Sequence, residues 1–172
     1  LPTLSRHAAR DDRVEMRRTV SNGLRLMLVV NVPATVGLIV LATPIVAMIF
    51  EHGRFTADDT AATAAALACY APGLIGYSAV KLAVPAFYAL RDSRTPVMVS
   101  VAAVAVNVVL NLTLARLLGF RGLALGTALA SLFNAIVLMV VLKGRLNGLA
   151  GYRLANSLSK VTAASAIIRM AA

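Results

Sequence analysis

Residues 95–115 have the sequence TPVMVSVAAVAVNVVLNLTLA, in which no side chain carries a charge. An α-helix rises about 1.5 Å per residue, so about 20 apolar residues are enough to cross the hydrocarbon core of a bilayer. The run has that length and contains no side chain that would be expensive to bury in lipid. It therefore predicts a transmembrane helix.

Three further runs of the same kind occur in the chain. They cover about residues 26–50, 60–90 and 122–142, and Lys81 is their only charged residue. Hydrophobic residues make up 59% of the chain, against about 45–50% in an ordinary soluble domain. Apolar helices also form the cores of soluble proteins, but four such runs leave too little amphipathic sequence to cover a core. The sequence predicts an all-α polytopic membrane protein, built as a bundle of transmembrane helices.

Basic residues collect in alternate loops between these runs. Twelve lie before the first run, between the second and third, or after the fourth, whereas three lie at the opposite turns. Cytoplasmic loops of membrane proteins carry an excess of Lys and Arg, so we place the larger set in the cytoplasm. The larger set is Arg6, Arg10, Arg13, Arg17, Arg18, Arg25, Arg91, Arg94, Lys143, Arg145, Arg153 and Lys160, and the smaller is Arg54, Arg116 and Arg121.

The net charge of +10 could also indicate a nucleic-acid partner. No basic stripe is interleaved with aromatic residues, however, and no nucleic-acid-binding motif is present. The charge flanks apolar spans, where anionic lipid headgroups attract each basic residue by about 1 kcal/mol. We therefore expect membrane lipids, and not nucleic acid, as the partners of these residues.

The four spans occupy residues 26–145, and polar segments flank them. We expect residues 1–25 to hold the end of a preceding helix and a cytoplasmic loop, with a short surface helix within 6–22. Residues 146–160 are expected to form a second cytoplasmic loop, and residues 161–172 the start of a further transmembrane helix. This organisation indicates an internal piece of a longer, transporter-sized chain.

Prolines interrupt two of the spans. Proline inside a helix removes one backbone hydrogen bond and bends the helix, and neighbouring helices in a membrane can satisfy the freed carbonyl. Pro33 in the first span and Pro72 and Pro85 in the second are therefore candidate bending points, which makes the predicted bundle a kinked one.

Catalysis has little support in the sequence. No hydrolase, nucleotide-binding or metalloprotease motif is present, both histidines lie in loops, and all seven acidic residues lie outside the apolar runs. An enzyme that acts within the membrane would normally need acidic groups there. We therefore expect no enzymatic activity and name no catalytic residue.

Lys81 is the most informative single residue. A lysine deep in a span costs about 2.5–3.5 kcal/mol on insertion scales unless it faces a cavity or reaches the interface. It lies nine residues from Leu90, or roughly 13 Å at helical rise. Its side chain either extends to the cytoplasmic interface or faces a cavity, where it would attract an anionic group such as a pyrophosphate.

Asn107 and Asn111 are four residues apart and share one face of the third predicted helix. Thr127 lies near the start of the fourth, at a similar distance from the short turn around Gly119. In an antiparallel hairpin these three side chains can meet. They would then either form hydrogen bonds between helices or provide oxygen ligands to a hard cation such as Na⁺.

Several of these stretches resemble the MurJ (MviN) family of lipid II flippases. The resemblance is carried by LPTLS at 1–5, the loop from Phe50 to Phe55, GLIG at 73–76, VKL at 80–82, PAFYALRDSRTP at 85–96, and the segment from Asn107 to Ala124. It covers nearly the whole chain. The asparagine-bearing hairpin is shared more widely, across the multidrug/oligosaccharidyl-lipid/polysaccharide exporter superfamily.

The resemblance implies a fold of fourteen helices, in two six-helix lobes with two further helices, of which this chain would hold the end of helix eight to the start of helix thirteen. It implies a protein of the bacterial inner membrane that moves lipid II to the outer leaflet by alternating access, during peptidoglycan biosynthesis. Its partners would be lipid II, membrane lipids and the remaining lobe. Some members hold Na⁺ between helices seven, eleven and twelve, but Asn111 stands where an aspartate is expected.

Other functions remain open at this stage. Another exporter of the superfamily, either a polysaccharide-lipid flippase or a cation-coupled drug antiporter, is one alternative. A drug antiporter would be expected to carry an acidic residue within the membrane, and these spans have none. A membrane scaffold without transport activity is the alternative from a different class. For a transporter, Na⁺ or the membrane potential would supply the coupling.

Overall fold

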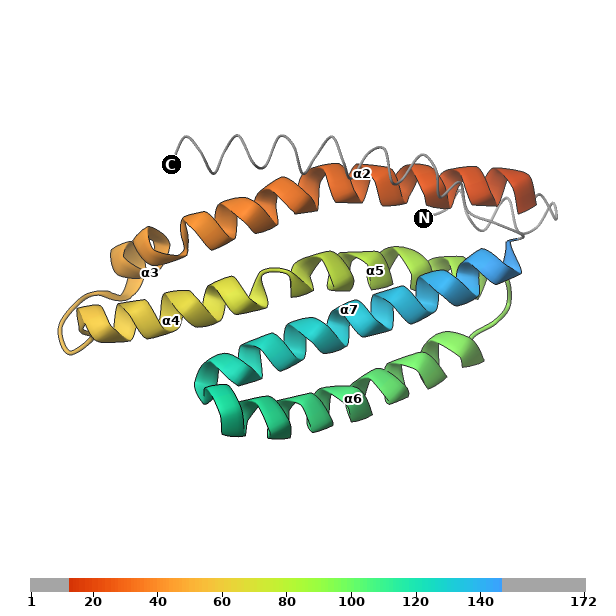
Figure 1. Cartoon of the computed structure of the whole chain (residues 1–172). Coiled ribbons are helices and arrows are strands. Elements are labelled where there is room, and N and C mark those ends of the chain that lie inside the picture. Colours follow the sequence, from red (N-terminus) through yellow and green to blue (C-terminus); the bar gives the residue numbers. More distant parts are fainter. Residues whose placement is uncertain (1–12, 147–172) are drawn as a thin grey trace.

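The computed structural model describes residues 13–146, and within this range the secondary structure is entirely helical (Figure 1). The expectations for residues 1–12 and for residues 147–172, which include most of the predicted loop at 146–160 and all of the helix start at 161–172, lie outside the described residues. The helices are α2 (Arg13–Val40), α3 (Ala42–Phe50), α4 (Ala57–Tyr70), α5 (Gly73–Ala89), α6 (Arg94–Leu118) and α7 (Phe120–Arg145).

Four helical stretches are long and apolar enough to cross a membrane. They are Val14–Val40, Ala57–Ala89 (α4 with α5), Arg94–Leu118 and Phe120–Arg145. They run up and down side by side, so the prediction of an all-α bundle of membrane helices is confirmed (Figure 1). The start of α2, the turn from α5 to α6 and the end of α7 lie at one end of the bundle. We call it the basic end, since it carries Arg17, Arg18, Arg91, Arg94, Lys143 and Arg145.

The polar segment before the first span differs from the sequence prediction. It was expected to be a loop with a short surface helix, but α2 begins at Arg13 and continues without a break into the span. Met16 and Val20 are buried there against Phe87 and Leu142. The apolar residues at 16, 20 and 24 follow a helical period between the arginines, and this narrow stripe packs into the bundle.

Two of the spans are each built from two helices. Between α2 and α3 the break falls at Leu41. In a continuous helix the ring of Pro44 would clash with the carbonyl of Val40, four residues earlier, so the helix is interrupted next to that carbonyl. Between α4 and α5 it falls at Ala71 and Pro72. Pro33 and Pro85, in contrast, lie inside α2 and α5 respectively, which continue past them.

Reciprocal hydrogen bonds between Thr56 and Asp59 hold the start of α4. The Thr56 hydroxyl accepts from the Asp59 backbone N–H, and the Asp59 carboxylate accepts from the Thr56 backbone N–H at 2.9 Å, which makes a capping box. Nearby, the Thr60 hydroxyl donates to Glu51 at 2.8 Å. These bonds join the short loop at this end of the bundle to the first turn of α4.

Helices α6 and α7 form a tight hairpin. Gly119 alone separates them and has a φ of +59°, a conformation that L side chains rarely adopt. A Cβ on Gly122 would clash with the backbone of Leu114, so the two helices are in backbone contact there. Gly122 and Gly126, four residues apart on α7, therefore allow the two helices to approach closely.

Helix α7 lies at the centre of the described bundle. It packs against α6 on one side and against α4 and α5 on another, while α2 packs mainly on α5. The main core cluster joins α2, α5 and α7 through Val20, Phe87, Leu138 and Leu142, each of which is completely buried. This arrangement leaves one face of α5, and most of α6, exposed.

Candidate functional site

Lys81 lies on the exposed face of α5. Its ammonium group sits over the ring of Tyr77, 4.6 Å from the ring centroid. Tyr77 precedes Lys81 by one helical turn, so the helix itself holds the pair together. A cation over an aromatic face contributes about 0.5–1 kcal/mol at an exposed site, which keeps the charge within the span instead of extended toward its end.

Tyr77 and Lys81 belong to a longer stripe. On α5, Tyr77, Lys81 and Tyr88 are spaced by four and seven residues, which returns each to the same side of the helix. Tyr70 lies seven residues before Tyr77, at the end of α4. Tyr70, Tyr77 and Tyr88 expose 46%, 57% and 55% of their surface. Tyr77 lies well inside the span 57–89, far from the interfacial positions that tyrosine prefers. Polar groups at this depth normally face a cavity or another helix.

A pocket of about 350 Å³ opens beside this stripe, between α4, α5 and α7. Tyr70 and Tyr77 line it from one side and Thr127 and Ser131 from the other. The Ser131 hydroxyl donates to the Gly73 carbonyl at 2.9 Å and so ties α7 to α5. The pocket therefore brings the hydroxyl groups of Tyr70 from α4 and of Thr127 and Ser131 from α7 next to Tyr77. The Lys81 ammonium group lies over the ring of the same tyrosine.

The structure brings Asn107 and Asn111 together, as the spacing predicted. Asn111 Nδ2 donates to Asn107 Oδ1 at 3.0 Å. Asn111 Oδ1 is buried against Gly126 and has no hydrogen-bond partner among residues 13–146. A side chain on Gly126 would occupy the position of this carbonyl oxygen, so the glycine makes room for the carboxamide.

Thr127 is separate from this asparagine pair. Its hydroxyl donates to the Leu123 carbonyl of its own helix at 2.9 Å, and it lines the pocket beside Tyr77. The antiparallel pairing places Gly126, the residue before Thr127, against Asn111. Of the three residues considered as cation ligands, Asn107 and Asn111 thus contact each other, whereas Thr127 lines the pocket beside Tyr77.

A polar contact within the membrane was not predicted from the sequence. Ser78 Oγ donates to Asn31 Oδ1 at 3.3 Å, and Asn31 Nδ2 donates to the Met27 carbonyl at 3.0 Å. The contact links α5 to α2 near the middle of both spans. Asn31 and Ser78 are each one of several polar residues in their apolar runs, and the number of residues between them gives no indication that they meet.

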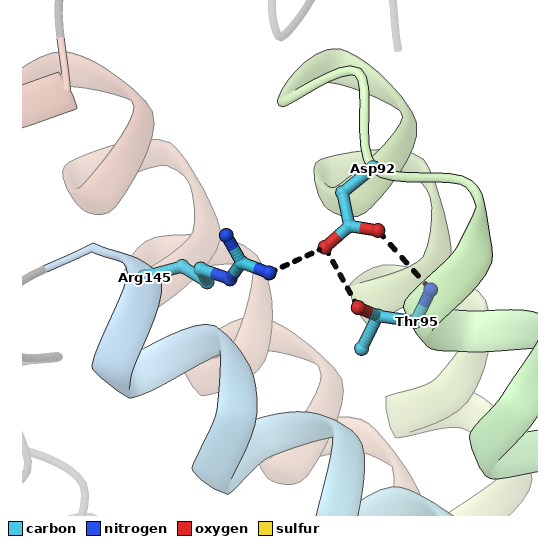
Figure 2. A network of polar contacts seen from close by, with 3 residues as sticks. All are labelled: Asp92, Thr95 and Arg145. Atoms are coloured by element: carbon cyan, nitrogen blue, oxygen red, sulfur yellow. Dashed lines mark hydrogen bonds and ion pairs between the residues drawn. The ribbon is translucent and has the colours of Figure 1, made fainter.

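At the basic end, a polar network ties α7 to the turn between α5 and α6 (Figure 2). The Asp92 carboxylate accepts from the Thr95 hydroxyl at 2.7 Å, from the Thr95 backbone N–H at 3.1 Å and from Arg145 Nη2 at 3.1 Å. The Thr95 hydrogen bonds, with a smaller contribution from Arg145, hold the pKa of Asp92 below its ordinary value. Asp92 thus binds a backbone N–H in the first turn of α6 and anchors the end of α7.

Four apolar spans, polar groups facing one another inside them and a basic end define a multi-pass helical membrane protein. Residues 1–172 match the family described as "Lipid II flippase MurJ". The chain belongs to this MurJ family, and the resemblance found in the sequence is confirmed.

Individual relatives agree with this assignment. The chain is 36% identical over 134 residues to the probable lipid II flippase MurJ of Rickettsia prowazekii (strain Madrid E). The matched segment covers 78% of this chain and 26% of that protein. It is 33% identical over 171 residues to the probable lipid II flippase MurJ of Synechocystis sp. (strain ATCC 27184 / PCC 6803 / Kazusa), covering 99% of the chain and 32% of that protein. The chain therefore spans about a quarter to a third of the length of these relatives.

A solved structure shows the same fold. The structure titled "Lipid II flippase MurJ, inward closed conformation" superposes with a TM-score of 0.73 at 29% sequence identity. The match covers 81% of this chain and 30% of that one. The helix bundle described above is therefore part of a membrane exporter fold.

Proposed function

We propose that this chain forms part of a lipid II flippase, in which its helices belong to the second of two lobes that alternate in access. Support comes above all from the match of all 172 residues to the MurJ family. The curated relatives carry the name lipid II flippase, so the substrate is the lipid-linked peptidoglycan precursor, and the remaining lobe is supplied by the rest of the polypeptide. The reaction is transport, with no chemical conversion of the lipid.

The direct experiment is depletion of the gene in its own bacterium, with measurement of the lipid II exposed on the outer leaflet. We expect exposure to fall and cell-wall synthesis to stop as the protein is lost. Normal exposure after depletion, in cells that contain no second flippase, would contradict the proposal. It would favour another exporter of the superfamily or a membrane scaffold without transport activity.

Lys81 is the residue proposed to contact the substrate. It is exposed within a span, beside a pocket lined by hydroxyl groups, and its charge is matched to a pyrophosphate. Hydrogen bonds to charged groups contribute about 1.5–3 kcal/mol, so Lys81→Met should lower the flipping rate about tenfold or more. Lys81→Arg should restore much of the rate.

The matched control for this test is Lys143→Met, which removes the same group from an exposed position at the basic end. It should leave flipping nearly unchanged. Protein amounts in the membrane must be equal for all variants. Full activity of Lys81→Met would show that the lysine has no contact with the substrate that matters for transport.

We further propose that the larger basic set, which includes the basic end, faces the cytoplasm, where lipid II is made. The excess of basic residues there supports this orientation. Cysteine labelling from outside the cell distinguishes the two orientations. A cysteine at Arg121 should react with an impermeant reagent in intact cells, and a cysteine at Arg94 should react only after the cells are opened.

Coupling to Na⁺ stays a proposal that the arrangement of side chains supports only in part. Among Asn107, Asn111 and Thr127, only Asn111 has a carbonyl oxygen without a partner in the described part of the chain. Hard cations prefer several oxygen ligands, usually with at least one carboxylate. A Na⁺ site here would need further ligands from elsewhere in the full-length protein. If it does not form, the membrane potential is the alternative driving force.

Substitution of Asn111 tests this point. Asn111→Asp restores the carboxylate that the family resemblance implies and should make the thermal stability of the full-length protein depend on Na⁺. The unsubstituted protein should show a smaller Na⁺ effect, and Asn107→Ala should reduce the effect in either background. A variant Asn111→Asp that does not respond to Na⁺ would rule out a cation site at this position.

A further inference from the structure

A second groove lies between α5 and α6 and plays no part in the proposed transport site. It holds about 380 Å³ and is mainly apolar, with Ser100 and the Tyr88 hydroxyl as its polar groups. Along α6 it extends from residue 96 to residue 104, which is about 12 Å at the rise of a helix. This length is close to the thickness of the hydrocarbon region of one leaflet, about 15 Å. Its walls include Val84, Tyr88, Pro96, Val97, Val101 and Val104.

The turn at the mouth of this groove contains an unusual arginine. Helix α5 ends with the hydrogen bonds Arg91 N–H to the Tyr88 carbonyl and Asp92 N–H to the Phe87 carbonyl, both 3.0 Å long. This is the Schellman pattern, in which the residue at the position of Arg91 is usually glycine. Arg91 has a φ of +55°, in the left-handed region. A conformation that glycine adopts freely is thus held by a long basic side chain, which suggests that its charge has a use.

No acidic side chain of the turn neutralises the positive charges of Arg91 and Arg94 at the mouth of the groove. The Asp92 carboxylate already accepts from Thr95 and pairs with Arg145 on α7. Arg91 and Arg94 are both exposed, and neither has an ion-pair partner among residues 13–146. Two unpaired guanidinium groups therefore flank the turn at which the apolar groove begins.

We infer that this groove binds an anionic membrane phospholipid, with its phosphate between Arg91 and Arg94 and one acyl chain along α6. The chemistry is complementary at both ends, since guanidinium groups bind phosphate oxygens well and the groove walls are apolar. The Tyr88 side chain, exposed beside the mouth, suits the level of the headgroups. Basic pockets between membrane helices bind anionic lipid headgroups in this way.

The test uses the full-length protein, purified in detergent and titrated with phosphatidylglycerol or with phosphatidylethanolamine of the same acyl chains. Native mass spectrometry counts the lipids bound. We expect phosphatidylglycerol to bind more tightly, and each arginine removed should weaken its binding about fivefold. The pair Arg116→Gln and Arg121→Gln, at the other end of the bundle, is the control and should bind as the unsubstituted protein does.

Arg91→Gly separates a lipid-binding role from a structural one. It removes the charge but supplies the residue that the backbone prefers, so phosphatidylglycerol binding should fall while the melting temperature in lipid-free detergent stays the same or rises. Arg94→Gln should lower binding similarly, and Arg91→Lys should keep much of it. Equal binding of both lipids, or unchanged phosphatidylglycerol binding in the Arg91→Gly, Arg94→Gln double variant, would overturn the inference.

A helix from elsewhere in the full-length protein is the other possible occupant. Val101→Trp places a large side chain in the groove, where Val101 is 66% exposed. With a lipid as the occupant, this variant should fold normally and lose one bound phosphatidylglycerol. If it instead destabilises the lipid-free protein and leaves lipid binding unchanged, a protein segment fills the groove and the inference is wrong.

Discussion

Helices α5 and α6 are joined by one short turn, yet they lie in opposite surroundings. α5 buries a row of small residues and Phe87 against its neighbours, whereas α6 buries only Pro96 and Ala103 among the residues that the structure describes. Each belongs to a span that is apolar enough to cross a membrane, α5 together with α4 and α6 by itself. The difference shows that apolar character decides whether a helix enters the membrane, while the size and rotation of its side chains decide what it packs against.

Replacement of Phe87, on the buried face of α5, should cause the largest loss of stability. Phe87 is completely buried in the cluster that joins α2, α5 and α7, and removal of a buried phenylalanine costs about 3–5 kcal/mol. Phe87→Ala should therefore lower the melting temperature of the full-length protein strongly. The neighbouring residue gives the control, since Tyr88 is 55% exposed and Tyr88→Ala should cost much less. Equal losses for the two variants would contradict the burial described here.

A single methyl group should test the close contact between α5 and α7. A Cβ on Gly76 would lie 2.7 Å from the Ser131 backbone, where no flexible side chain can yield. Gly76→Ala should destabilise the protein by about 1–3 kcal/mol. Gly37→Ala in α2 is the matched control, because nothing lies within 4 Å of its Cβ, and it should stabilise the helix by up to about 1 kcal/mol. Thermal unfolding that ranks the two variants in the opposite order would reject this packing.

The smallest effect should come from the link between α7 and the α5–α6 turn. Because the pKa of Asp92 is lowered in the folded protein, its contribution to stability is present above the pKa of the unfolded chain and is lost as the pH falls through the lower, folded value. Asp92→Asn should thus be less stable than the unsubstituted protein near neutrality, and the difference should begin to shrink as the pH falls below about 4. Melting temperatures from pH 3 to 7 measure it, and a difference independent of pH would contradict the network in Figure 2.

Much of the fold could be predicted from the sequence because its signals are local. The four spans follow from uncharged runs of sufficient length, and the start of α4 follows from the Thr56 capping box. The close approach of α6 and α7 follows from Gly122 and Gly126, since residues of a tight hairpin meet in a known order. Family membership was also predictable, from motifs distributed along most of the chain.

The candidate site was only partly predictable. The spacing of Asn107 and Asn111 predicts their contact, because one helical turn separates them. The orientation of Thr127 toward the pocket beside Tyr77 depends on how α7 is rotated between α5 and α6. The burial of Met16 and Val20 was missed because the arginines around them dominate the composition of that segment.

The sequence by itself determined that this chain crosses the membrane, how many described spans it has, and which loops carry the positive charge. These properties depend on the transfer of each segment from water to lipid, which adds up residue by residue. Only the tertiary structure decided that Lys81 rests on Tyr77, that Asn31 meets Ser78, and that Arg91 holds a left-handed turn at the mouth of a groove. Such features depend on which helices are neighbours and on their rotation about their own axes, and in uniformly apolar spans the pattern of hydrophobicity carries little information about either.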